Sequence, residues 1–234
     1  MEHIDEKYLV PTSILDSDNE DVIRFADDIA GNKSDPVEIA VRLYYAVRDK
    51  IWYDPYSPFY LPEHYRASNI LKSRRGFCIH KASLLCSLGR VREIPTRIGF
   101  ANVKNHLATG QLLDYMGTDI FAYHGFTEFY LDGRWVKATP AFNKELCQRH
   151  NVAPLEFNGR EDSIFHAYNN DNSPFMEYLE YLGTYSDIPV DVILAEFEKV
   201  YGKDRINARI EEFEKGEGRS FRDFDKEEIV KILP

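Results

Sequence analysis

Apolar side chains recur with helical spacing in two segments near the start of the chain, residues 19–30 and 36–51. In the second segment, Asp35 is suited to cap the helix and Pro36 to occupy its first position. The apolar side of that segment consists of Val37, Ala40, Val41, Tyr44 and Val47. The pattern therefore predicts two helices before residue 52.

The segment from Trp52 to Pro62 breaks the helical pattern because it combines five aromatic residues with three prolines. We expect a loop here, and its rings either fix the loop to the core or form one wall of a binding site. A short helical turn is expected at residues 68–71, ahead of a glycine-containing turn at Gly76.

From Cys78 to about Gly89 the pattern is helical and apolar on more than one side, which predicts a largely buried helix. Its apolar residues are Ile79, Ala82, Leu84, Leu85 and Leu88. Gly89 and the Ile94-Pro95 pair are expected to end this helix.

Strand patterns follow at residues 96–102, 120–131 and 134–139, and a loop through residues 105–106 and 116–119 separates the first two. The Asp132-Gly133 pair predicts a tight hairpin between the last two strands. The register set by that turn pairs Glu128 with Lys137, Tyr130 with Trp135, and Phe129 with Val136. These charge, aromatic and apolar pairings are favourable, so the sequence predicts this register.

After Pro140 the pattern is less regular. We expect helical pieces at residues 143–150 and 174–182, helices at 190–201 and 204–215, and a flexible break at 216–218 before a charged tail. The whole chain, 1–234, is expected to form one domain, with a core at about 36–141 and a helical extension at about 142–234.

Composition narrows the function classes. The net charge of −10 and the pI near 5.2 argue against nucleic-acid binding. No segment approaches the roughly 20 apolar residues needed to span a bilayer, so no membrane association is expected. Three cysteines without dense spacing do not indicate a disulfide framework, which favours a reducing, cytoplasmic location.

Cys78 and His124 together indicate a thiol nucleophile. The positive end of the helix dipole at Cys78 favours the thiolate, His124 on the second strand would accept the thiol proton, and the amide of Cys78 would help to hold an oxyanion. The hairpin register places Thr139 diagonally from His124 on the same face, roughly 7 to 8 Å away between backbone positions. Taken singly, the cysteine and the histidine are equally compatible with structural roles in the core.

Three blocks in this order resemble the transglutaminase-like superfamily of papain-like thiol enzymes, in a bacterial-type stand-alone domain covering about residues 40–141. The first block is Gly76-Phe77-Cys78 with the apolar helix that follows it. The second block comprises Leu88-Gly89 and Ile94-Pro95-Thr96-Arg97, and the third is residues 124–136, HGFTEFYLDGRWV.

The resemblance implies an α+β fold in which a buried helix carries the cysteine at its N-terminus and packs on an antiparallel sheet that carries the histidine, with further helices at both ends. It also implies acyl transfer by a Cys-His-Asp triad without a cofactor, with Cys78 as the nucleophile and His124 as the base. The chain departs from the family at Thr139, which stands where an aspartate is usual.

Alternatives for the group that orients His124 are the carboxylates of Asp119, Glu128 and Asp162 and the amide of Asn143. Trp52, Tyr53 and Phe77 are predicted to contact the substrate. No metal is expected, although Cys147 and His150, with Cys78 and His80, form a minor zinc alternative.

The leading hypothesis is a cysteine acyltransferase or amide hydrolase that passes through a thioester, with hydrolysis ranked above crosslinking. Its substrate would be a peptide, a protein or a small amide. The alternative is a catalytically weakened or inactive peptide-binding or protein-binding module on the same fold. The sequence indicates neither the acyl donor and acceptor nor the oligomeric state.

Overall fold

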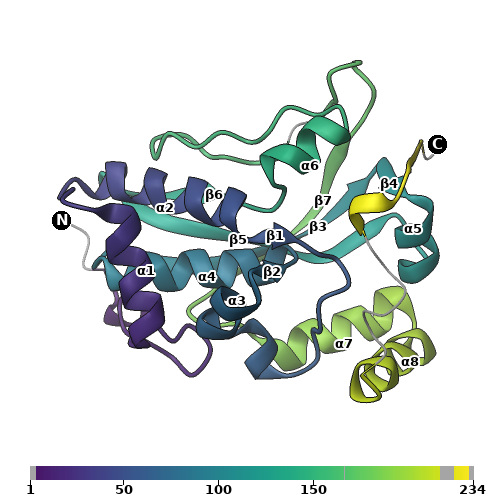
Figure 1. The fold of residues 1–234 in the computed structure, drawn as a ribbon, viewed down its shortest axis with the longest axis horizontal. Helices are drawn as coiled ribbons and strands as arrows, with labels where there is room; N and C mark the ends of the chain where they lie inside the picture. The colour runs from purple at the N-terminus through teal and green to yellow at the C-terminus, as the bar shows by residue number, and fades with distance from the viewer. Residues whose placement is uncertain (1–3, 166, 217–223, 232–234) are drawn as a thin grey trace.

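The centre of the fold, in a computed structural model that describes residues 4–165, 167–216 and 224–231, is an antiparallel sheet with the strand order β6-β5-β3-β7 (Figure 1). The strands are β3 (Thr96–Asn105), β5 (Ile120–Leu131), β6 (Arg134–Ala138) and β7 (Met176–Tyr185). The hairpin register predicted from the sequence is confirmed, because Glu128 pairs with Lys137 and Phe129 with Val136.

Helix α4 (Cys78–Val91) packs across one face of this sheet and is buried over almost its whole length. Side-chain hydroxyls of the strands fix it in place: Thr127 donates to the carbonyl of Ala82 at 3.0 Å and Thr96 donates to that of Cys86 at 2.9 Å. The predicted α+β arrangement, a buried helix on an antiparallel sheet, is therefore confirmed.

Gly89 lies inside α4, so the prediction that it helps to end this helix is wrong. A Cβ atom at residue 89 would lie 2.5 Å from the side chain of Thr96 and 2.8 Å from the ring of Phe129. The glycine is therefore explained by close packing of the helix on the sheet rather than by helix termination.

The N-terminal helices α1 (Glu20–Ala30), α2 (Pro36–Lys50) and α3 (Ala67–Ser73) surround α4 in Figure 1. The predicted cap of α2 is present, because the Asp35 carboxylate accepts the amide of Val37 at 3.1 Å. Short 3₁₀ turns occur at Glu6–Tyr8 and Pro62–Tyr65. The aromatic loop contains one short strand, β1 (Trp52–Tyr53), paired with β2 (Arg75–Gly76).

Two predicted non-strand segments fold differently. Residues 105–119, expected as a loop, contain β4 (Leu107–Thr109) and α5 (Gly110–Met116). Residues 174–182, expected to be helical, form most of β7. Pairing with the long edge of β3 determines the conformation of this segment, and such tertiary pairing overrides local preference.

The C-terminal part is divided in Figure 1, where its first helix lies at the top of the view and the next two helices lie at the lower right. It contains α6 (Lys144–Arg149), α7 (Val190–Tyr201) and α8 (Lys203–Glu214), close to the predicted helices, and α7 packs against β5. A 3₁₀ turn at Phe224–Lys226 leads to β8 (Ile229–Lys231), which pairs with β4. Residues 217 and 218 of the predicted break lie outside the described residues. Within the described ranges, no helix has the length and apolar character to cross a membrane.

Replacing Gly89 with Ala should destabilise the protein by about 1–3 kcal/mol, because the added methyl group overlaps Thr96 and Phe129. Gly110→Ala is the matched control, since the nearest atom to its new Cβ lies 4.0 Å away at Val230. Urea unfolding should show a lower midpoint for Gly89→Ala alone. A Gly89→Ala variant as stable as the unchanged chain would contradict the packing argument.

Candidate active site

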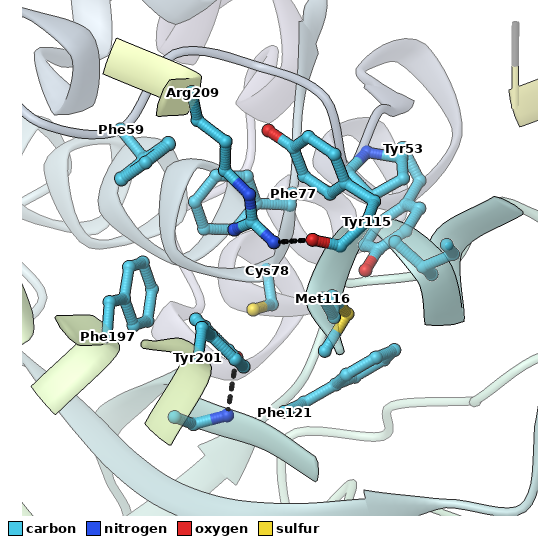
Figure 2. Close-up of a pocket in the computed structure, with 13 residues that line it drawn as sticks. Tyr53, Phe59, Phe77, Cys78, Tyr115, Met116, Phe121, Phe197, Tyr201 and Arg209 are labelled. Atoms are coloured by element: carbon cyan, nitrogen blue, oxygen red, sulfur yellow. Dashed lines mark hydrogen bonds between the residues drawn. The ribbon is translucent and has the colours of Figure 1, made fainter. Parts of the chain in front are cut away.

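Cys78 is the first residue of α4, and its thiol lines an apolar cavity of about 70 Å³ (Figure 2). The walls come from segments far apart in the sequence: the aromatic loop, the start of α4, α5, β5, α7 and α8. Representative lining residues from these segments are Tyr53, Phe77, Tyr115, Phe121, Tyr201 and Arg209. The thiol is thus a buried member of the core that lines one side of an aromatic-rich cavity.

The local sequence explains why the thiol reaches this cavity. Strand β2 pairs with β1 and passes directly into α4 through Gly76, whose carbonyl accepts the amide of Asp54 at 3.1 Å. A Cβ atom at Gly76 would collide with the side chain of His80. Glycine at this position therefore lets the strand turn sharply into the helix and places Cys78 at its tip.

Burial raises the pKa of the Cys78 thiol to about 12, while the backbone amides of Gly125, Ile79 and Cys78 favour the thiolate and act in the opposite direction. Desolvation is the larger effect, so Cys78 is a neutral thiol in this arrangement. The same amides are suited to stabilise negative charge on the sulfur or on an adjacent oxyanion once one forms.

His124 lies on β5, fully buried, with its ring 4.3 Å from that of Phe165 between centroids. Burial lowers the pKa of its imidazole to about 3. Among the described residues, neither ring nitrogen has a hydrogen-bond partner, so the imidazole is bonded neither to Cys78 nor to Thr139.

The position of the imidazole follows from side-chain alternation on β5. Gly125 faces α4, since a Cβ there would lie 3.0 Å from the Cα of Ile79, and Thr127 faces α4 as well. Successive side chains of a strand point to opposite faces, so His124 and Phe126 point away from the helix. The backbone of His124 nevertheless adjoins the amide of Gly125, which faces the sulfur of Cys78.

Thr139 lies just beyond β6, and its hydroxyl is buried without a hydrogen-bond partner in the described part of the chain. Its carbonyl accepts the Tyr44 hydroxyl at 3.2 Å. The β5–β6 register places Thr139 on the same face as His124, as predicted, but the hydroxyl does not bond to the imidazole.

The other groups considered for orienting His124 have partners elsewhere. Glu128 forms an ion pair with Arg97 at 2.6 Å, Asp162 accepts the amide of Lys137 at 2.9 Å, and Asp119 lies 3.4 Å from Lys104. The side chain of Asn143 is also occupied: its oxygen accepts the Tyr53 amide at 2.7 Å and its nitrogen donates to the carbonyls of Arg48 and Ile51. None of the four orients the imidazole in this structure.

Two of the three predicted substrate contacts, Tyr53 and Phe77, line the cavity, whereas Trp52 is outside its lining. The sequence analysis missed the contributions of Tyr115, Tyr201 and Arg209, which come from α5, α7 and α8. The apolar side of the helix predicted at 190–201 indicated that this segment packs against another part of the protein. The spacing of residues along the sequence does not identify that part.

The zinc alternative finds no support in the described ranges, where no group of three or more His, Cys, Asp or Glu side chains is placed to hold a metal. Cys86 lies in the core, with its sulfur 3.6 Å from the hydroxyl of Thr127. His106 lies 3.3 Å from a carboxylate oxygen of Glu177, and His166 lies outside the described residues.

Comparison with known proteins identifies the family. The sequence model of the transglutaminase-like superfamily matches residues 23–140, about half of the chain. The chain belongs to the transglutaminase-like superfamily. The matched range contains Cys78, His124 and Thr139, and the segments α6, α7 and α8 follow it. No curated protein matches the chain significantly.

Solved structures similar to this transglutaminase-like chain are distant. A candidate cysteine protease from Cytophaga hutchinsonii shares 17% identity with a TM-score of 0.47, over 80% of this chain and 48% of that one. The periplasmic domain of TgpA from Pseudomonas aeruginosa, bound to ethylmercury, shares 16% identity with a TM-score of 0.39, over 57% of this chain and 46% of that one. This chain therefore spans about half the length of the Cytophaga protein.

The buried imidazole of His124 should make stability depend on pH. Below about pH 6.5 the unfolded chain protonates this histidine while the folded chain keeps it neutral down to about pH 3, so the unfolded state binds more protons. Folding stability should therefore fall on acidification through this range, with His124 contributing up to about 1.4 kcal/mol per pH unit. Urea unfolding between pH 4 and 7 measures the slope.

The variant His124→Leu should flatten this slope and retain stability at pH 7, because an apolar side chain suits the surroundings. Phe165→Leu is the control, since it weakens packing on the ring but keeps the titrating group, and the slope should persist. An unchanged slope in His124→Leu would show that another group causes the acid sensitivity.

Proposed function

We propose that this protein is a cysteine acyltransferase or hydrolase that cleaves amide or peptide bonds through a thioester on Cys78. One observation carries the proposal: a thiol at the N-terminus of a buried helix lines an aromatic cavity while three backbone amides face its sulfur. Membership of the transglutaminase-like superfamily supports the same chemistry. A thiol fixed only for packing would require neither the cavity nor the amides.

The first half of the reaction forms the thioester. His124 removes the Cys78 proton, the sulfur attacks the substrate carbonyl, and the amide of Cys78 stabilises the oxyanion. The imidazolium then returns the proton to the leaving amine as the C–N bond breaks. In hydrolysis, water attacks the thioester, His124 accepts a proton from it, and the carboxylic acid leaves as the thiol re-forms.

These reaction steps require the imidazole of His124 to approach the sulfur of Cys78 after substrate binds. Catalytic hydrogen bonds are often long or poorly aligned before substrate binds and tighten in the complex. The backbone supports such a movement because His124 directly precedes Gly125, whose amide already faces Cys78. The imidazole now points to the face of the sheet opposite α4, so its approach to the thiol requires a change in the backbone of β5 at His124 and displacement of Phe165 from its ring.

Thr139 is proposed as the orienting residue for the rotated imidazole, because its hydroxyl is buried on the same face and makes no other bond among the described residues. A hydroxyl supplies direction but no negative charge, so the imidazolium would be less stable than beside an aspartate. Peptide or protein substrates, hydrolysis rather than crosslinking, and a cytoplasmic location remain predictions from the sequence.

A second candidate function, a binding module with lost or weakened chemistry, is favoured by one observation. Cys78 and His124 are both neutral and are not bonded to each other, and no carboxylate among the described residues is bonded to the imidazole. Such a module would use the aromatic cavity to hold a side chain of a peptide or protein. Reactivity at Cys78 distinguishes the two functions.

Limited treatment of the native protein with iodoacetamide should modify Cys78 before Cys86 and Cys147, because only Cys78 lines the cavity. Peptide mapping by mass spectrometry locates the modification. Cys78→Ala should abolish it and leave circular dichroism unchanged, while Cys86→Ala and Cys147→Ala serve as controls that retain it. Equal labelling of native Cys78→Ala would count against the enzyme.

Thr139→Asp should raise the pKa of His124, because a carboxylate on the same face stabilises the imidazolium, and should leave the alkylation rate of Cys78 unchanged or increase it. NMR titration of the imidazole measures the shift. Thr139→Val, which has a similar shape, is the control and should not raise the pKa. A large loss of reactivity in folded Thr139→Asp would show that Thr139 does not occupy the orienting position.

A further inference from the structure

Tyr201 is the last residue of α7, and its phenol lines the same cavity as the Cys78 thiol. The cavity measures about 70 Å³, so a chemical group that enters it lies close to both side chains. Figure 2 shows the Tyr201 side chain beside Cys78. The reaction steps given above use the thiol and leave this hydroxyl without a role.

The hydroxyl of Tyr201 has a fixed position. Its oxygen accepts the backbone amide of Ala122, on β5, at 2.8 Å, and this bond is a dashed line in Figure 2. The ring lies 5.2 Å from that of Phe197 between centroids, and the guanidinium carbon of Arg209 lies 5.5 Å from its centre. Contacts from β5, α7 and α8 therefore hold the hydroxyl at the cavity wall.

The bond to Ala122 determines what the hydroxyl can still do. A backbone N–H can only donate, so this bond occupies a lone pair of the phenol oxygen and leaves the O–H proton available. In the part of the chain that the structure describes, no acceptor lies within hydrogen-bond distance of that O–H. A ligand in the cavity that supplies an acceptor would satisfy this donor.

Two features make the O–H of Tyr201 a good donor. Burial is the main cause that raises the pKa of the Tyr201 hydroxyl, and the nearby Cys78 adds to it, so the phenol keeps its proton. The bond from the Ala122 amide favours the phenolate and is the smaller effect. It polarises the phenol and thereby strengthens the hydrogen bond that the O–H can donate.

We infer that the Tyr201 hydroxyl donates a hydrogen bond to the carbonyl oxygen of the acyl donor while Cys78 attacks the carbonyl carbon. As the S–C bond forms, the π electron pair of the carbonyl moves onto its oxygen. The phenol keeps its proton and stabilises the resulting oxyanion together with the amide of Cys78. When the oxyanion collapses, the C=O bond re-forms, the C–N bond breaks, and the leaving amine takes its proton from His124.

This inference rests on the proposed function and names a further catalytic residue of the same site. Tyr201 lies beyond residues 23–140, the range that matches the superfamily model. The C-terminal helices would then contribute to the reaction itself, in addition to covering the cavity.

Two reagents that modify the same thiol test the role of Tyr201. p-Nitrophenyl acetate acylates the sulfur through an oxyanion and releases p-nitrophenolate. Iodoacetamide alkylates it by displacing iodide at a saturated carbon, without an oxyanion. The measured quantity is the ratio of the acylation rate to the alkylation rate at Cys78, from peptide mapping. Tyr201→Phe should lower this ratio at least about tenfold, as expected for loss of one donor to an oxyanion, and leave the alkylation rate nearly unchanged.

Tyr45→Phe is the matched control. The Tyr45 hydroxyl also accepts a backbone amide, that of Phe157 at 3.2 Å, and donates to Glu156 at 2.6 Å, but Tyr45 lies outside the cavity lining. The ratio should stay within about twofold in this variant, because the site is distant from the thiol. 3-Fluorotyrosine in place of Tyr201 keeps the oxygen that accepts the Ala122 amide and makes the O–H more acidic. It should raise the ratio above that of the unchanged chain, an effect that a purely structural role would not produce.

The outcomes separate this inference from the proposed function. Acylation of Cys78 with the same ratio in the unchanged chain and in Tyr201→Phe would overturn the role of Tyr201 and leave the nucleophile in place. An equal fall of both rates in Tyr201→Phe would also overturn it, since the residue would then only support the structure around the thiol. Failure of the unchanged chain to be acylated would overturn both proposals. If Tyr201→Phe does not fold by circular dichroism, the fluorinated variant decides, and a ratio no higher than that of the unchanged chain would contradict the inference.

Discussion

The close contact between α4 and β5 is the constraint on which the site depends. Gly125 has no side chain, so the strand approaches the Cα of Ile79 and its amide reaches the sulfur of Cys78. Gly89 allows the same close approach at the other end of the helix, against Thr96 and Phe129. The two glycines let the helix lie tightly on the sheet, and Cys78 at its tip faces the cavity as a consequence.

The site includes buried polar groups that have no hydrogen-bond partner among the described residues. The His124 nitrogens and the Thr139 hydroxyl are buried without partners among the described residues, although burying such groups normally costs free energy. A chain selected for stability alone would place apolar side chains at both positions. Proteins retain such local costs at functional sites, and here both groups lie on one face, next to the backbone that contacts the thiol.

Local signals predicted much of the fold. The cap at Asp35, the Asp132-Gly133 turn and the helical patterns from residues 190 and 204 depend on neighbouring residues, and the structure agrees with them. The sequence also predicted Cys78 at the tip of a buried helix. Features that depend on long-range contacts were harder to predict from the sequence. Pairing with β3 makes a strand of residues 176–185, and packing against Phe129 explains why residue 89 is a glycine. The contribution of Arg209 to the cavity depends on how α8 folds back, which spacing along the chain does not show.

The central claim, that Cys78 carries an acyl group, is tested most directly by intact-mass spectrometry after incubation with p-nitrophenyl acetate. The account predicts one acetyl group per chain, located on Cys78 by peptide mapping and released by hydroxylamine as expected for a thioester. A folded protein that acquires no acetyl group, or acquires it equally on Cys86 and Cys147, would contradict the account.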